Sequence, residues 1–376
     1  MNATRRRLQT ETPTSSNSSR SSRLPVLDML RIFAAICVAV SHLVDIESKY
    51  DPNPIFPDKL NWGVFGVDMF FVISGYLMVV IAKRRGDALR PLPYLADRAA
   101  RIYPLYWLVS AALLAVWIVR PDVVFSSNTD PDILKSFLLW PAPADPLHAL
   151  GYSLIHFMFF YIVFTLLLAV FRSKRIVIGL AVWCIVLAGV NAALFSIDSL
   201  PTRQTPELRI LLHPYAFSFI VGGLVAGLPR RKMVGLAALI IGMAATLFSL
   251  FGPQYLFDYN MKMDEWGRVV FRALPFAVAV YGAGCFSTSP INIPFQRKLA
   301  DIAFATILIH VLTFSLVGRF WAPFAVPAWW DNILAFTVMG IFTIIVSWIA
   351  YEFLEKPICN FLRGLYRQKP TSDRVI

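Results

Sequence analysis

Charged residues are scarce in this chain, and acidic residues are the scarcer of the two signs. Only 15% of its 376 residues are charged, with 23 acidic against 35 Lys and Arg, whereas 57% are hydrophobic. Soluble globular domains carry about 25% charged residues, so this composition excludes a soluble protein. The mean hydropathy is +0.61, and apolar runs of about 20 residues recur along the chain. The sequence therefore predicts an all-α polytopic membrane protein.

Cysteine is also rare, and its spacing argues against two kinds of site. The chain has four cysteines, namely Cys37, Cys184, Cys285 and Cys359. They are widely spaced, form no CxxC pair and lie in or beside apolar runs, which disfavours a disulfide framework and a metal site. We expect them to be small core residues, and no metal site is predicted.

We expect about ten transmembrane helices, near residues 25–46, 62–82, 102–119, 149–171, 176–196, 209–228, 233–251, 267–287, 299–318 and 332–354. Of the 35 basic residues, 24 fall on the side of the N-terminus and 9 on the opposite side. Positive charge marks the cytoplasmic side, so both termini should be cytoplasmic in a multi-pass protein of the inner (plasma) membrane. This distribution accounts for the net charge of +12 without a nucleic-acid partner.

Three regions follow from this reading. Residues 1–23 are polar, basic and rich in Ser and Thr, which predicts a disordered cytoplasmic tail. Residues 24–362 form the transmembrane domain, and residues 363–376 form a second cytoplasmic tail. Loop 120–148 holds one apolar stretch, DILKSFLLW, which can lie at the membrane interface as an amphipathic segment.

The first apolar run carries ionisable groups that a membrane span normally excludes. Arg31 and His42 lie eleven positions apart, about three helical turns and about 16 Å, so they share one face. Asp28 precedes Arg31 at the i, i+3 spacing that allows pairing. Charged groups at such depth usually face a bundle interior or a water-filled cavity. The alternative is that Arg31 and His42 extend to the two membrane surfaces.

Two further stretches combine polar groups with helix-disturbing residues. In the second predicted span, Asp68 lies near the outer end, and Ser74, Gly75 and Tyr76 interrupt the apolar run. Gly75 can allow a close approach of backbones or of a ligand, and ordinary small-residue packing is the alternative.

At the start of the third span, Arg98 and Arg101 share a face at i, i+3, and paired arginines suit phosphates. Pro104 is expected to break the helix locally. The alternative is positive-inside anchoring with an aromatic belt of Tyr103, Tyr106 and Trp107.

Together these stretches resemble the acyltransferase 3 family, integral-membrane enzymes that O-acylate sugars and lipids. The resemblance lies in LDMLRIFAAICVAVSH (27–42), GVDMFFVISGYLM (66–78) and RAARIYPLYW (98–107), with weaker matches in TILIHVLTF (306–314) and YEFLEKP (351–357). The five motifs occur in order across residues 24–362, and the predicted ten spans agree with that family's core.

The resemblance implies an O-acyltransferase with a cytoplasmic acyl-CoA donor, most often acetyl-CoA, and no bound cofactor. The acceptor would be a glycan or lipid-linked sugar of the cell envelope, such as an exopolysaccharide or lipopolysaccharide. It also implies roles for seven residues: Arg31, His42 and Asp68 would be catalytic, and Ser74, Tyr76, Arg98 and Arg101 would bind the donor.

One motif departs from the family pattern. Family members commonly have Trp-Ser-Leu, two residues and then Glu before Phe-Tyr, whereas this chain reads GYSLIHFMFFY (151–161) with Phe157 at the position of Glu. His156 is adjacent and can substitute for the carboxylate. For His156 and His148 we favour interfacial anchoring.

The side chains themselves suggest the chemistry. Acyl transfer to a hydroxyl needs a base, and histidine is the side chain suited to that role near neutral pH, so His42 is the candidate, with Asp45 or Asp68 to orient it. Alternatively His42 is transiently acylated. Asp28, His310 and Glu355 are possible supporting residues. We expect His310 to serve helix packing, and we expect Glu352 and Glu355 to have a structural role in which they pair with Lys356 or with the arginine cluster. A transporter or flippase for a lipid-linked sugar, with the buried charges lining its path, is the competing class.

Overall fold

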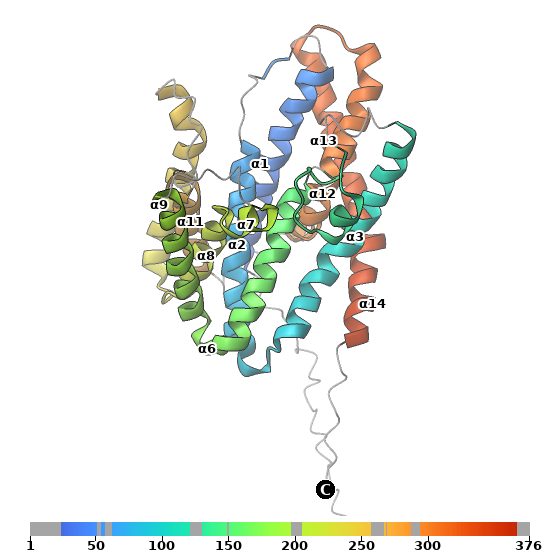
Figure 1. Ribbon diagram of the computed structural model, residues 1–376. Helices are drawn as coiled ribbons and strands as arrows, with labels where there is room; N and C mark the ends of the chain where they lie inside the picture. The colour runs from blue at the N-terminus through green and yellow to red at the C-terminus, as the bar shows by residue number, and fades with distance from the viewer. Residues whose placement is uncertain are drawn as a thin grey trace, which may run out of the picture.

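The computed structural model describes residues 24–50, 54–56, 62–120, 130–148, 150–196, 205–256, 267, 269–286 and 294–366. Its regular structure over these residues is entirely helical, and eight helices are long and apolar enough to cross a membrane. The chain is therefore an all-α polytopic membrane protein, as predicted (Figure 1). The predicted tail 1–23 and most of the tail after residue 362 lie outside the described residues.

The elements in chain order are α1 Pro25–Tyr50, α2 Trp62–Arg85, η1 Gly86–Ala88, α3 Pro91–Val119, α5 Ile133–Leu138, α6 Gly151–Ser196, α7 Pro206–Leu211, α8 Tyr215–Val225, α9 Lys232–Leu256, η3 Val269–Ala273, α11 Leu274–Cys285, α12 Pro294–Trp321, η4 Ala322–Phe324, α13 Trp329–Ala350, η5 Tyr351–Glu355 and α14 Lys356–Tyr366. The short elements η1 and η4 are 3₁₀ turns, and η3 and η5 are π-helical turns.

The ten predicted spans each correspond to helix in this structure. Helix α6 runs for 46 residues, but Arg172 has a positive φ of 56° that divides it into two predicted spans. The shorter apolar helix Val269–Cys285 occupies the eighth predicted span. Of the eight helices that are long and apolar enough to cross a membrane, α6 corresponds to two predicted spans and each of the others to one. Together with Val269–Cys285 they make the predicted ten.

Several helix ends meet at one end of the bundle, which we call the basic end. Asp97 near the start of α3 lies 3.9 Å from Arg85 at the end of α2 and 3.3 Å from Arg363 of α14. The Ser173 hydroxyl, just after the division of α6, donates to the Gly86 carbonyl at 2.7 Å. The basic end lies at the bottom of Figure 1, where α14 is labelled.

Helix α3 is not broken at Pro104, so that prediction was wrong. It begins at Pro91 and continues through Pro104 to Val119. Proline has no N–H, which leaves the carbonyl of Ala100, four residues earlier, without its helical partner. The Cys359 thiol of α14 donates to that carbonyl at 3.1 Å. A neighbouring helix therefore satisfies the carbonyl that Pro104 leaves free, and α3 stays helical.

Helix α5 folds back against the middle of α3 instead of lying apart from the bundle. Three aromatic side chains of α3 donate to consecutive carbonyls at its end: Tyr106 to Ser136 (2.6 Å), Trp107 to Phe137 (2.8 Å) and Tyr103 to Leu138 (2.8 Å). The last carbonyls of a helix lack the usual i+4 partner, and of these three the Ser136 carbonyl also accepts from the Leu139 N–H at 3.2 Å. The three aromatics thus anchor a short helix, a role different from the aromatic belt considered above.

The chain after α5 then enters the middle of the bundle. The His148 Nε2–H donates to the carbonyl of Leu308, halfway along α12, at 3.0 Å, and His148 is 2% exposed. His156, one turn into α6, is fully buried. The predicted interfacial anchoring of His148 and His156 was therefore wrong, because this re-entrant segment carries both rings into the protein interior.

Helices α2 and α8 are in backbone contact through two glycines. A Cβ on Gly75 would lie 1.9 Å from the Phe219 carbonyl oxygen, and one on Gly222 would lie 2.0 Å from the Val72 carbonyl oxygen. The close approach expected at Gly75 is therefore present, and its partner is a helix backbone. This packing turns the Ser74 side of α2 away from α8.

Candidate active site

A cavity that is partly open to solvent lies between α1, α2, α3, α6 and α12, and its empty space together with the solvent at its opening amounts to about 1120 Å³. Arg31, Arg98 and Arg101 line it together, from two different helices. The paired side chains predicted at i, i+3 therefore do share one wall, and Arg31 faces the same space. We call this cavity the arginine pocket.

The arginine pocket carries an excess of positive charge. The Arg31 guanidinium lies 3.6 Å from the Asp28 carboxylate, the pairing expected from their spacing. The charges of Arg101 and Arg98 both act against that of Arg31. Arg98 Nε is buried and makes no hydrogen bond within the described part of the chain. The described lining of the pocket holds three guanidiniums and no carboxylate, although Asp28 pairs with Arg31 from outside it and Arg101 acts electrostatically on the nearby Glu355. This surplus of positive charge favours an anionic ligand, because buried charge is stable only when it is compensated.

Apart from the arginines, the pocket lining is mostly apolar and contains one polar pair. Ser74 Oγ and the Tyr161 hydroxyl are 3.3 Å apart, and both line the pocket. Phe157 also lines it and stacks on Phe71, with ring centroids 4.3 Å apart. The position where the family pattern has Glu is thus filled by an aromatic wall, and Tyr161, one turn later, supplies a hydroxyl.

His156 points away from the arginine pocket and does not take the place of that carboxylate. Its Nδ1 contacts the Tyr152 carbonyl at 2.8 Å, and its ring lies 4.6 Å from that of His213 and 5.1 Å from that of Tyr215. Neighbouring residues of a helix point about 100° apart, so Phe157 and His156 face different elements.

A cluster of imidazoles lies just past the inner end of the pocket. Val38 of α1 and Ile307 of α12 line the pocket, and His42 and His310 follow them by about one turn. The two rings are 5.1 Å apart between centroids. His42 Nδ1 is 3.5 Å from Asp45 Oδ2, and the His42 side chain is 31% exposed. His310, expected to be a packing group, is therefore the aromatic neighbour of His42.

His148 is the third imidazole of this cluster, and both of its ring nitrogens are hydrogen-bonded to the backbone. The Leu150 N–H donates to His148 Nδ1 at 3.0 Å, so Nδ1 accepts, and Nε2 carries the proton donated to Leu308. Burial lowers the pKa of His148 to about 4, and the nearby His42 lowers it further, while its hydrogen bonds oppose the shift. His148 is thus neutral at pH 7 with both nitrogens engaged, which suits a structural role.

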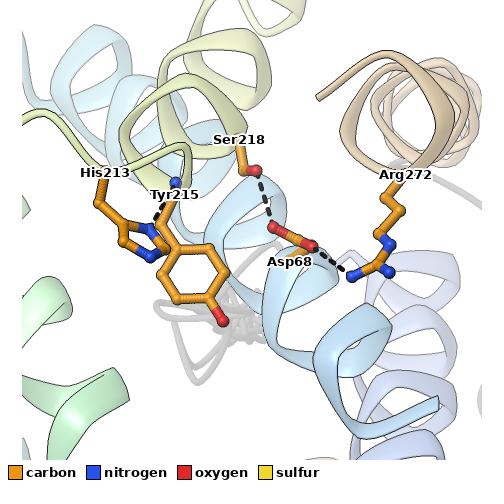
Figure 2. A network of polar contacts seen from close by, with 5 residues as sticks. All are labelled: Asp68, His213, Tyr215, Ser218 and Arg272. Carbon is orange, nitrogen blue, oxygen red and sulfur yellow. Dashed lines mark hydrogen bonds and ion pairs between the residues drawn. The ribbon is translucent and has the colours of Figure 1, made fainter. Parts of the chain in front are cut away.

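Asp68 lies on the other side of α2 from the pocket, in a polar network of its own (Figure 2). The Ser218 hydroxyl donates to Asp68 Oδ1 at 3.0 Å, and Arg272 of η3 lies 3.9 Å from Oδ2. Arg272 also covers the Phe65 ring at 4.4 Å. Asp68 is absent from the pocket lining, so its predicted catalytic role stays a prediction that this geometry does not support.

Tyr76 is likewise absent from the pocket lining. It is 1% exposed, and its hydroxyl occupies the space where a Cβ on Gly284 of α11 would lie. Its predicted donor-binding role has no support from the pocket either.

The acidic residues of the last span divide into one paired and one buried group. Lys356 donates to Glu352 at 2.6 Å. Glu355 is 4% exposed, and Arg101 acts on it electrostatically. Across the described residues, no group of three His, Cys, Asp or Glu side chains is arranged to hold a metal ion.

Tyr161 and His148 are the functional-site neighbours that sequence reasoning missed. Tyr161 occurs in the Phe-Tyr pair that matched the family, but no spacing rule connects it to Ser74. His148 lies in a loop after a short apolar helix, and only the tertiary contact with α12 brings it near His42.

Comparison with known proteins identifies the family. Residues 24–352 match the acyltransferase 3 family over the region described as an acyltransferase domain. This match covers most of the chain, which therefore belongs to the acyltransferase 3 family and is a membrane O-acyltransferase.

Two curated proteins are similar to the chain. The exopolysaccharide production protein ExoZ of Rhizobium meliloti (strain 1021) is 26% identical over 319 residues, covering 81% of this chain and 92% of ExoZ. The O-acetyltransferase OatA of Staphylococcus aureus (strain NCTC 8325 / PS 47) is 24% identical over 370 residues, covering 89% of this chain but 57% of OatA. No solved structure matches the chain significantly.

Proposed function

We propose that this O-acyltransferase moves an acetyl group from cytoplasmic acetyl-CoA to a hydroxyl of an exported or cell-envelope polysaccharide, or of a lipid-linked sugar. It would do so in the inner membrane with both termini in the cytoplasm. The names of the two relatives support the acceptor and acyl classes, since one concerns exopolysaccharide production and the other O-acetyl transfer.

The observation that carries the proposal is the order of groups along the arginine pocket. Three arginines line it toward the basic end, and apolar side chains line its length. The His42–His310 pair follows at its far end. Acyl-CoA has the same order: charged phosphates, a thin pantetheine arm and a thioester. The arginines would bind phosphate oxygens, and the apolar passage would hold the arm and exclude water.

His42 is the residue we assign to the chemistry in this reaction. Asp45 Oδ2 lies 3.5 Å from His42 Nδ1, and a carboxylate there favours the proton on Nδ1 and the lone pair on Nε2. That lone pair can take the hydroxyl proton as a general base or attack the thioester carbonyl. Arg31, held by Asp28, would bind the donor on the same helix about three turns away.

The test is the turnover of labelled acetyl-CoA by purified full-length protein and the His42→Gln variant. Gln retains hydrogen bonding but cannot titrate, so glycan acetylation should fall by ~10²-fold or more. The two proteins must be compared at equal membrane abundance. Near-normal turnover by the variant would show that His42 serves packing alone.

A matched control is available in His148→Gln. His148 belongs to the same cluster, but both of its nitrogens are engaged with the backbone. Gln can keep the bond to the Leu308 carbonyl, so this variant should retain most activity if it folds. Equal loss in both variants would indicate a general disturbance of the cluster.

A further inference from the structure

His310 presents a basic nitrogen that no described residue uses. Its ring is fully buried, and Nδ1 lies 2.6 Å from the Ile307 carbonyl and 3.2 Å from the Thr306 carbonyl. Carbonyl oxygens only accept, so Nδ1 carries the proton and Nε2 keeps its lone pair. Nε2 is buried and has no hydrogen-bond partner among the described residues. Such a group in a protein interior costs about 1–3 kcal/mol and calls for an explanation.

The neighbour of that ring is the candidate catalytic His42, with centroids 5.1 Å apart. The two imidazoles come from different helices, α1 and α12, and each follows a residue that lines the arginine pocket by about one turn. His310 Nδ1 donates to the Ile307 carbonyl, and Asp45 Oδ2, 3.5 Å from His42 Nδ1, favours the proton on that nitrogen. Each ring therefore keeps one free lone pair in the same small region.

We infer that His42 is the acyl carrier and that His310 is the base that deprotonates the acceptor hydroxyl. This inference rests on the proposed function and divides its reaction into two half-reactions. A reaction in which His42 acts as general base needs one imidazole and gives His310 Nε2 no task. A reaction through acyl-His42 occupies His42 Nε2 and needs a second base, which is the role that His310 can fill.

In the first half-reaction, His42 Nε2 attacks the thioester carbonyl carbon. The N–C bond forms, the C–S bond breaks, and CoA leaves as the thiolate. The product is an acyl-imidazolium whose Nδ1 proton remains directed at Asp45, so the carboxylate balances the positive charge that forms on the ring.

In the second half-reaction, the acceptor oxygen attacks the acyl carbon while its proton passes to His310 Nε2. The O–C bond forms, the C–N bond breaks, and the electron pair returns to His42 Nε2. The proton on His310 passes to water that enters once the ester has left the site, and water also protonates the CoA thiolate, so the overall products are the ester and CoA. Burial of His310 keeps water from competing with the acceptor hydroxyl for the acyl group.

Isotope exchange separates the two half-reactions without any acceptor. Purified full-length protein is incubated with acetyl-CoA and tritiated free CoA, and label entering acetyl-CoA is measured. Acetylation of the cell's own surface glycan by each variant, at matched abundance, is the second readout. Wild type should catalyse the exchange, because a reversible acyl-His42 returns the acetyl group to any CoA.

The variants are chosen to keep the fixed nitrogen of each ring. An Asn amide nitrogen lies near the position of His Nδ1, so His310→Asn can keep its bond to Ile307 while removing Nε2. We expect His310→Asn to retain exchange within a few-fold of wild type and to lose glycan acetylation by ~10²-fold. His42→Asn should lose both readouts.

Each contrary result overturns a different statement. Wild type that acetylates glycan but shows no exchange would exclude acyl-His42 and leave the proposed function intact. His310→Asn that loses exchange and acetylation equally, with an unchanged melting temperature, would exclude His310 as the second base. A wild-type protein that supports no acetylation in cells would overturn the proposed function itself.

Discussion

Arg98 and Arg101 are the side chains whose role can be separated most cleanly from folding. Both line the arginine pocket. Arg98→Ala with Arg101→Ala should raise the dissociation constant for acetyl-CoA by at least tenfold, since each charge-assisted bond contributes about 1.5–3 kcal/mol. The measurement is a titration of purified protein with labelled acetyl-CoA.

The control removes the same charge elsewhere on the basic end. Lys174 and Arg175 follow the division of α6 and are exposed, and neither lines the pocket. Lys174→Ala with Arg175→Ala should leave acetyl-CoA affinity within twofold. Equal weakening in both double variants would mean that net charge, and not a specific clamp, attracts the donor.

His148 makes stability depend on pH in a defined window. Its pKa in the folded protein is about 4, against an ordinary value of 6.5, because burial disfavours the charged ring. The unfolded chain therefore binds more protons between these values, so stability is complete above pH 6.5 and declines as pH falls toward 4. At about 1.4 kcal/mol per pKa unit, the loss reaches roughly 3 kcal/mol.

Melting temperatures in detergent between pH 7 and pH 4 measure this decline. His148→Gln does not titrate and can keep the bond to Leu308, so its profile should be flatter than that of wild type. Parallel profiles would show that other groups cause the acid sensitivity.

At the scale of helices, the contact between α2 and α8 gives a test of packing. A Cβ on Gly75 would lie 1.9 Å from the Phe219 carbonyl oxygen. This oxygen belongs to the backbone of α8, so it cannot move aside unless the two helices separate. Gly75→Ala should destabilise the protein by about 1–3 kcal/mol, as overpacking does. Thermal unfolding of the purified protein gives the difference.

Gly340 of α13 provides the same substitution in open space. Among the described residues, no atom outside its own stretch of helix backbone lies within 4 Å of a Cβ placed there, and Ala is favoured over Gly in a helix by about 1 kcal/mol. Gly340→Ala should therefore be neutral or stabilising. If both variants melt like wild type, α2 and α8 are not held by close packing at Gly75.

The sequence predicted these helices well and their local irregularities less well. Apolar runs and the 3.6-residue period placed Arg31 and His42 on one face, because both signals are local. The continuous helix at Pro104 was missed, because the Cys359 thiol that satisfies Ala100 comes from 259 positions away. The same reason hid the anchoring of α5, where side chains of α3 bond to carbonyls about 30 positions away.

The candidate site was predictable in its residues and not in its arrangement. Motif matching named the three arginines and His42, and all of them lie at or near one pocket. It also named Asp68 and Tyr76, which share α2 with Ser74 but face α8 and α11. A buried helix is apolar on all sides, so its sequence has little amphipathic signal to indicate which side chains face which neighbouring helix. The packing of the surrounding helices decides this. The partnership of His42 and His310 likewise depends on the pairing of α1 with α12.

At the scale of the whole molecule, the direction of acyl transfer depends on orientation in the membrane. The arginine pocket is lined by α3 residues near the basic end, whereas His42 lies about 16 Å further along α1 than Arg31. If the basic end is cytoplasmic, acetyl-CoA enters from the cytoplasm and the acyl group moves outward to the imidazole pair. The reverse orientation would present the arginines to a compartment without acyl-CoA.

Cysteine labelling tests this orientation at two exposed positions on opposite ends of the bundle. Ala88 lies in η1 at the basic end, and Val326 follows η4 at the other end and is 44% exposed. The native Cys37, Cys285 and Cys359 are buried, and Cys184 is half-buried. The bias of 24 basic residues against 9 predicts a cytoplasmic basic end. A membrane-impermeant maleimide added to intact cells should therefore label Val326→Cys at once and Ala88→Cys only after permeabilisation. Wild type gives the background, and the opposite labelling order would reverse both the topology and the proposed direction of acyl transfer.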